Sequence, residues 1–100
     1  MKSFINLLWP RSAAAQAANA YEQLARAMAL QTEGAAFYKN GQYDAAVPCL
    51  ETALALWTIL GDFHAEQRLF EWLATCYSHL GQSQAAQYCD QEALALAQRI

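Results

Sequence analysis

A stretch of the chain recurs 40 residues further along, and this internal repeat limits the possible folds more than any other feature. The segment GQYDAA at 41–46 aligns with GQSQAA at 81–86. Further residues in the same register are Cys49 with Cys89, Phe37 with Tyr77, and 53–56 with 93–96. A fixed period of this length is typical of proteins that stack one supersecondary unit upon the next.

Within each unit the apolar residues recur at three- and four-residue spacing, which is the pattern of a helix face. In the second unit this face is formed by Leu69, Phe70, Leu73, Ala74, Cys76, Tyr77 and Leu80. A second apolar stripe follows it, up to about Arg99, and the first unit repeats both stripes. The sequence therefore predicts an all-α fold of two helical hairpins, at about 22–61 and about 62–100.

Turn and capping residues mark the ends of these helices. Gly81 follows Leu80 where a left-handed residue ends many helices, and Asp62 and Ser83 are predicted N-caps. Pro48 removes one helical hydrogen bond, so we expect a slight kink there or a late start of that helix.

The N-terminal segment is predicted to have two parts. Residues 12–21 extend the first helix backwards, with Ser12 at its cap and a break at Pro10-Arg11, so that 12–100 form one domain. Residues 1–11 then form a short apolar arm. Its apolar run stops at Pro10, which is short for the core of a signal peptide, so we assign it to the mature protein.

Three placements of this arm are open. It folds back over the first hairpin, docks into a partner protein, or lies on a membrane surface. The membrane alternative is the least favoured, because only Lys2 and Arg11 supply positive charge.

The charge and the cysteines exclude several classes of protein. A formal net charge of -3, with scattered cations, gives no basic patch for nucleic acid. Three widely spaced cysteines without a C-x-x-C pair predict neither a disulfide framework nor a metal site, and we interpret them as small core residues in a reducing cytoplasm.

No catalytic pattern is present in the sequence, so we expect a non-enzymatic protein without a cofactor. There is no glycine-rich phosphate loop and no recognisable nucleophile–base arrangement. His64 is expected to be solvated at a helix start, and His79 suits a helix C-terminus as an imidazolium.

The repeat resembles the tetratricopeptide repeat family in a lengthened form, over residues 22–100. The residues that carry the resemblance are Gly34, Phe37, Gly41, Tyr43, Ala46, Ala53 and Leu54, then Leu73, Ala74, Tyr77, Gly81, Ala86, Ala93 and Leu94. Glu33, Asp90 and Thr58 depart from the usual pattern. The resemblance implies a short α-α superhelix that binds proteins, in which small residues let paired helices approach closely.

By the same resemblance, the first helix of each hairpin lines an inner groove that binds peptides. The residues that this register places in the groove are Gln31, Ala35, Tyr38, Lys39, Arg68, Glu71, Trp72, Thr75 and His79. Trp72 beside Arg68 is a candidate anchor for a partner, and the alternative is that Trp72 packs on the neighbouring helix. Trp57 is predicted to be core. The clamp that some members use for C-terminal carboxylates is not expected, because Gln31 and Ala35 replace its residues.

The predicted function is therefore protein binding, as an adaptor, assembly factor or small accessory subunit. A structural, self-associating homodimer is the alternative. Two hairpins leave the ends of the stack uncovered, and the last helix has apolar residues on two sides. We expect its interface with a partner or a second copy to be formed by Leu94, Leu96, Ala97 and Ile100.

Overall fold

The computed structural model describes the backbone of residues 2–100 and the side chains of residues 19–100. Over this part of the chain there are four helices and no strand. They are α1 (Lys2–Lys39), α2 (Tyr43–Leu60), α3 (Phe63–His79) and α4 (Ser83–Arg99). The all-α fold predicted from the apolar spacing is confirmed.

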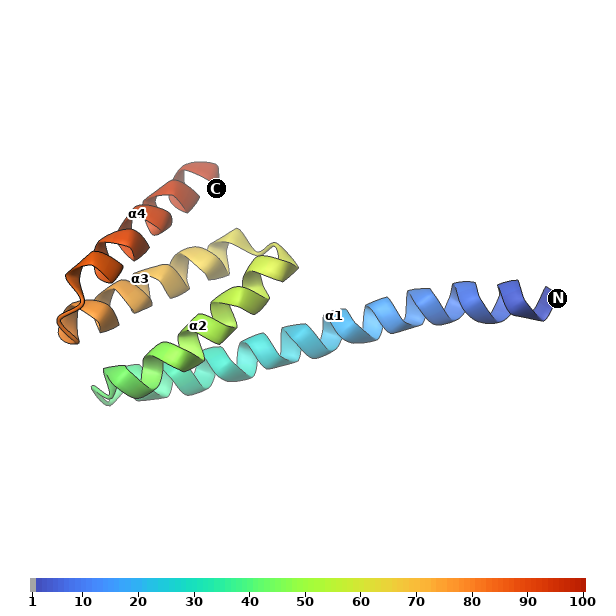
Figure 1. Ribbon diagram of the computed structural model, residues 1–100, viewed down its shortest axis with the longest axis horizontal. Helices are drawn as coiled ribbons and strands as arrows, with labels where there is room; N and C mark the ends of the chain where they lie inside the picture. Colours follow the sequence, from blue (N-terminus) through green and yellow to red (C-terminus); the bar gives the residue numbers. More distant parts are fainter. Residues whose placement is uncertain (1) are drawn as a thin grey trace.

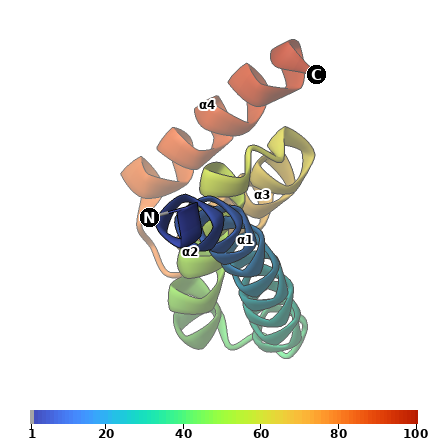
Figure 2. The same ribbon diagram turned by 90° about the vertical axis from the view of Figure 1, so that its right-hand side faces the viewer.

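The helices form two antiparallel hairpins stacked side by side (Figure 1). α1 pairs with α2, α3 pairs with α4, and α2 joins the hairpins by packing on α3. Figure 2 looks along α1 and shows α4 on the far side of α3 from it. α3 therefore lies in the middle of the stack and can present a different face to each side.

Glycines and one aspartate end and begin the helices. Gly61 has φ 77° and Gly81 has φ 77°, a left-handed conformation that side chains disfavour, so the predicted helix stop at Gly81 is confirmed. The Asp62 carboxylate accepts a hydrogen bond from the Ala65 amide at 3.0 Å, as its predicted N-cap role requires.

One local prediction was wrong. Ser83 is the first residue of α4 and not its N-cap, which is Gln82 and makes no side-chain capping bond. Of the two effects expected of Pro48, the late start is excluded, because α2 begins at Tyr43 and continues through Pro48, and the slight kink stays a prediction. Pro48 is the sixth residue of α2, where its missing N–H would otherwise bond the carbonyl of Asp44.

The core lies between the hairpins and consists of leucine, alanine, cysteine and one tryptophan. Its fully buried residues are Ala27, Ala46, Leu50, Ala53, Leu69 and Cys76. Trp57 is buried, as predicted. Gly34 lies so close to α2 that a Cβ atom there would be 2.7 Å from Cδ2 of Leu50. The close approach expected of small residues is thus present between α1 and α2.

The break predicted at Pro10-Arg11, with a cap at Ser12, is absent from the backbone. α1 runs without interruption from Lys2 to Lys39 and contains Pro10 as its ninth residue, where the missing N–H removes one helical hydrogen bond but does not end the helix. Its N-terminal half extends beyond α2 and does not fold back over the hairpin (Figure 1). The side chains of the arm at 1–11 are outside the described residues, so its docking to a partner or a membrane stays a prediction. Among the described residues, no helix combines the length and apolar character that crossing a bilayer demands.

Candidate partner-binding surfaces

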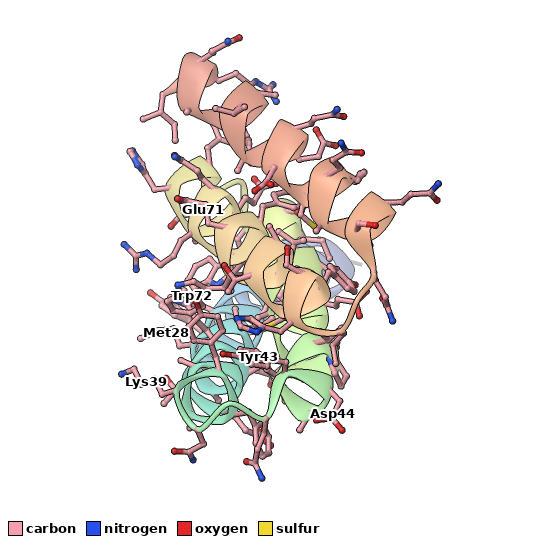
Figure 3. All side chains as sticks on the ribbon, turned by 90° about the vertical axis from the view of Figure 1, so that its left-hand side faces the viewer. Met28, Lys39, Tyr43, Asp44, Glu71 and Trp72 are labelled. Atoms are coloured by element: carbon pink, nitrogen blue, oxygen red, sulfur yellow. The ribbon has the colours of Figure 1, made fainter. Side chains whose placement is uncertain are left out.

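The first surface is the groove between α1 and α3, where four aromatic rings lie in a row. Tyr38 stacks on Trp72 with ring centroids 6.0 Å apart, and it meets Tyr43 edge-on at 5.9 Å. Tyr43 in turn stacks on His79 at 4.2 Å. The register predicted from the sequence thus brings Tyr38, Trp72 and His79 together across two hairpins. Figure 3 labels Tyr43 and Trp72 on the side of the molecule where these rings lie.

Trp72 packs on a neighbouring helix and also keeps an open face, so the two interpretations of its sequence position are compatible. It is half-buried because it packs on Tyr38, and its remaining surface lines a hollow of about 390 Å³. The other residues lining this hollow, which we call the α1–α3 groove, are Gln31, Thr32, Ala35, Ala36 and Lys39. An aromatic side chain that is held by a neighbour yet open on one side is a suitable partner anchor.

The remaining predicted groove residues have different surroundings. Gln31 is partly occupied within the fold, since its Oε1 accepts a hydrogen bond from Nε1 of Trp57 at 2.8 Å. Arg68, Glu71 and His79 are exposed, and Thr75 is half-buried. These exposed side chains can contact a partner without first losing an internal bond.

The sequence reasoning missed an apolar stripe on the same face of α1. Tyr21, Leu24 and Met28 are 73%, 37% and 55% exposed, and they continue the stripe of Thr32 towards the N-terminus. Met28 lies one helical turn before Thr32, which lines the groove. The three- and four-residue spacing of this stripe was readable in the sequence, but no prediction was made for these residues. The α1–α3 groove therefore opens onto a row of exposed apolar side chains.

The second surface is the outer face of α4. Leu94 and Ile100 are 66% and 51% exposed and Ala97 is also exposed, but Leu96 is buried at 7% and faces the core. Leu96 was therefore wrongly assigned to the terminal interface. It follows Leu94 by two residues, which is about 200° around a helix, so the two point in nearly opposite directions.

The 40-residue repeat relates this face to one that is covered in the first hairpin. Leu54 is half-buried and Trp57 is buried, whereas their counterparts, Leu94 and Ala97, are exposed. A hollow of about 370 Å³ lies on this face, between α3 and α4. Asp90 lines it where the first hairpin has buried Leu50, so the open end is more polar than the covered one.

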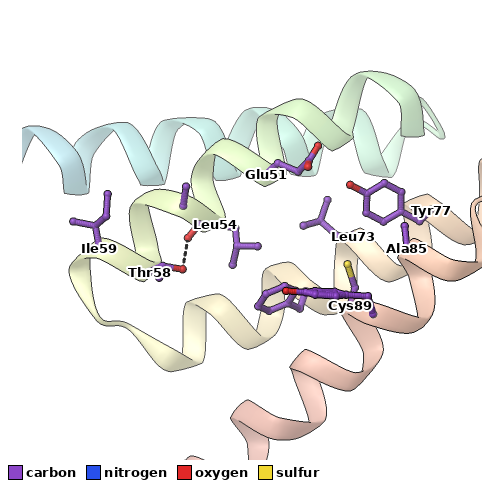
Figure 4. A pocket seen from close by; sticks show the side chains of 11 residues that line it. Glu51, Leu54, Thr58, Ile59, Leu73, Tyr77, Ala85 and Cys89 are labelled. Carbon is purple, nitrogen blue, oxygen red and sulfur yellow. Dashed lines mark hydrogen bonds between the residues drawn. The ribbon is translucent and has the colours of Figure 1, made fainter.

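The third surface is an apolar cleft between α2 and α4, with α3 as its floor, and nothing in the sequence reasoning pointed to it. Its volume is about 580 Å³ (Figure 4). We call it the α2–α4 cleft; it is lined by Glu51, Leu54, Ala55, Thr58, Ile59, Phe70, Leu73, Tyr77, Ala85, Tyr88 and Cys89. It arises because α2 and α4 both pack on α3 and leave a gap between themselves, and no local pattern encodes that gap.

Titratable groups beside the cleft have shifted pKa values. Burial, followed by the charge and hydrogen bonding of the Glu51 carboxylate, raises the pKa of Tyr77 to about 12. Burial also raises the pKa of the Cys76 and Cys89 thiols, which keeps these free cysteines protonated. Among the described residues, no cluster of three or more histidine, cysteine or carboxylate side chains is arranged to hold a metal ion.

Two stacked helical hairpins with a groove between their first helices define a helical repeat protein of the interaction class. The sequence profile described as "Tetratricopeptide repeat" matches residues 26–99, and the chain belongs to the tetratricopeptide repeat family. The comparisons with curated proteins and with solved structures gave no match. Members of this family generally mediate protein–protein interaction and are typically not enzymes.

Proposed function

We propose that this chain binds a partner protein as an adaptor, assembly factor or small accessory subunit of a larger complex. The partner segment lies in the α1–α3 groove, and the outer face of α4 provides a second contact. The supporting observation is the exposed row of Tyr21, Leu24 and Met28, which continues along α1 to Thr32 in the groove that Trp72 lines. Arg68 is exposed on α3 one turn before Trp72. Tryptophan, tyrosine and arginine are the residues that most often dominate binding energy at interfaces.

The composition of the groove favours an extended segment with apolar side chains and at least one carboxylate. Apolar side chains of the partner can pack on Met28 and Trp72, while Arg68 and Lys39 are exposed for charge-assisted hydrogen bonds. The three free thiols are consistent with a reducing compartment such as the cytoplasm, which we propose as the site of action.

A structural homodimer is the second candidate, and the exposed Leu94 and Ile100 favour it. A twofold contact through α4 would cover the end of the stack in both copies. Light scattering on the purified chain separates the candidates, because a stable monomer requires a different partner and a tight dimer indicates self-association.

The test of the groove uses substitutions at exposed positions that leave the fold intact. Met28→Glu and Arg68→Glu should each reduce capture of partner proteins from native cell extract, and Ala29→Glu on another face of α1 is the control. Loss of the same captured protein with both variants, at unchanged helicity, supports the proposal. Capture that is equal for all four chains would place the partner elsewhere.

A further inference from the structure

We infer that the α2–α4 cleft is a second binding site, and that it takes a basic amphipathic peptide segment of a partner protein. The inference builds on the proposed role in protein binding but concerns a different surface. Four properties of the cleft carry it: its position, its apolar lining, the small residues at its mouth and the carboxylates around it.

The cleft and the α1–α3 groove lie on opposite sides of α3. Leu73 and Tyr77 line the cleft, whereas Thr75 and His79 belong to the groove register. Leu73 and Thr75 are two residues apart, and so are Tyr77 and His79. Two residues correspond to about 200° around the helix axis. A ligand in the cleft therefore makes no contact with Trp72, and the two sites can be occupied together.

The lining of the cleft is that of a ligand site rather than of ordinary surface. Phe70 and Leu73 of α3 form its floor and Leu54 of α2 lines one wall. Its volume of about 580 Å³ lies in the range of pockets that enclose most of a bound group. Such apolar surface left open to water is a marker of binding sites.

Small side chains keep the cleft open between the two outer helices. Ala55 on α2 and Ala85 on α4 both line it, where larger residues would fill the space. α2 and α4 make almost no direct contact with each other, since each packs on α3. The cleft is thus open between the two outer helices, and apolar side chains of a peptide segment can enter it.

The charges around the cleft select a cationic ligand. Glu51 lines it, and Glu92 lies beside Tyr88, whose pKa is raised mainly by hydrogen bonding to that carboxylate. Glu66 accepts a hydrogen bond from Thr58 Oγ1 at 3.0 Å at one end. The lining contains no lysine, arginine or histidine, so its electrostatic field attracts cations, and the apolar walls strengthen that attraction.

Aromatic rings reinforce this selection. Phe70 and Tyr88 lie 6.4 Å apart at 56°, and Tyr77 lines the same cleft. Ring faces next to a carboxylate bind lysine and arginine side chains through cation–π contacts together with charge-assisted hydrogen bonds. A segment with apolar residues on one side and a lysine or arginine among them matches both features.

The experiment uses the full chain and two synthetic helical peptides with the same leucine pattern, one carrying lysines and the other glutamates. Binding is followed by fluorescence anisotropy of the labelled peptide. We expect the lysine peptide to bind at least about tenfold more tightly, as one net charge-assisted contact provides. Equal affinity for both peptides, or no binding of the lysine peptide, overturns the inference.

Three variants locate the binding. Glu51→Gln keeps the shape of the cleft and should weaken the lysine peptide about tenfold, and Ala55→Arg should abolish its binding by filling and recharging the cleft. Ala29→Arg adds the same side chain at an exposed position of α1 and should change nothing. If Ala55→Arg and Ala29→Arg bind the peptide equally, the cleft is not the site.

The two proposals fail separately. Met28→Glu should leave the lysine peptide bound at full affinity, while Ala55→Arg should leave the groove partner captured. Partner capture that survives both Met28→Glu and Arg68→Glu removes the proposed groove site alone, and equal affinity for the lysine and glutamate peptides removes the cleft site alone.

Discussion

Tyr38 of α1 stacks on Trp72 of α3 with their rings 6.0 Å apart and inclined by 27°. The contact joins the first helices of two successive hairpins, which α2 otherwise links only from the other side. The same pair borders the α1–α3 groove, so packing between the hairpins also sets the position of the candidate anchor. Stability and recognition are therefore coupled at this point.

The first prediction concerns the strength of that stack. A double-mutant cycle with Tyr38→Ala and Trp72→Ala should give a coupling energy of about 0.5–1.5 kcal/mol, which is the usual contribution of an aromatic pair beyond its buried area. Urea unfolding of the four proteins measures it. A coupling energy near zero would mean that the two rings are merely adjacent.

The second prediction concerns the close approach of α1 and α2. Gly34→Leu should destabilise the fold by about 1–3 kcal/mol, because the new side chain meets the fully buried Leu50. Ala36→Leu, at an exposed position two residues away, is the matched control and should have little effect. Similar melting temperatures for both variants would show that α2 can move away from α1 at no cost.

Local patterns in the sequence predicted most of the fold. The spacing of Leu69, Leu73 and Cys76 identified the buried face of α3, and Asp62 and Gly81 marked helix ends, because these signals act over a few residues. The repeat register placed Tyr38 and Trp72 in the same groove, but it did not predict that their rings stack. Helix faces and helix ends depend on helix geometry alone.

Other features depend on how the helices are arranged in space, and the sequence could not supply them. The α2–α4 cleft exists because α3 holds two helices apart, which no motif on either helix records. Leu96 was misplaced because both stripes of α4 are apolar and only the position of α3 decides which one is covered. Pro10 was read as a break, but it lies within α1, which loses one hydrogen bond there and continues.

The third prediction concerns pH. The folded state holds the proton of Tyr77 up to about pH 12, whereas an unfolded tyrosine has a pKa of 10.0. Because the pKa is raised in the folded state, Tyr77 makes its full contribution to the free energy of unfolding below pH 10.0. That contribution is lost as the pH rises to about 12. The free energy of unfolding of the natural chain, relative to that of Tyr77→Phe, should therefore fall as the pH rises through that window.

Chemical denaturation of both chains at about pH 9 and at about pH 11.5 gives their free energies of unfolding and so tests this prediction. Subtracting the Tyr77→Phe values removes the titration of lysines and cysteines that both chains share. Glu51→Gln should bring the folded-state pKa of Tyr77 closer to 10.0, because the carboxylate is, after burial, a secondary cause of the raised pKa. A pH-independent difference between the two chains would contradict the raised pKa.

The last prediction separates the two sides of α4, which the sequence alone could not tell apart. Leu96 is buried, so Leu96→Glu places an unpaired carboxylate in the core and should cost at least about 3 kcal/mol. Leu94 is 66% exposed, so Leu94→Glu should change the stability of the isolated chain by less than about 0.5 kcal/mol.

If the outer face of α4 is the proposed contact, Leu94→Glu should nevertheless abolish association, because a charge buried unpaired in an interface is strongly unfavourable. Ala95→Glu adds the same charge to an exposed position about 100° around the helix, and it should keep the association. Light scattering gives the oligomeric mass and capture from extract gives the hetero-partner for each variant. Retention of both by Leu94→Glu would show that α4 only closes the stack and that partners bind through the grooves beside α3.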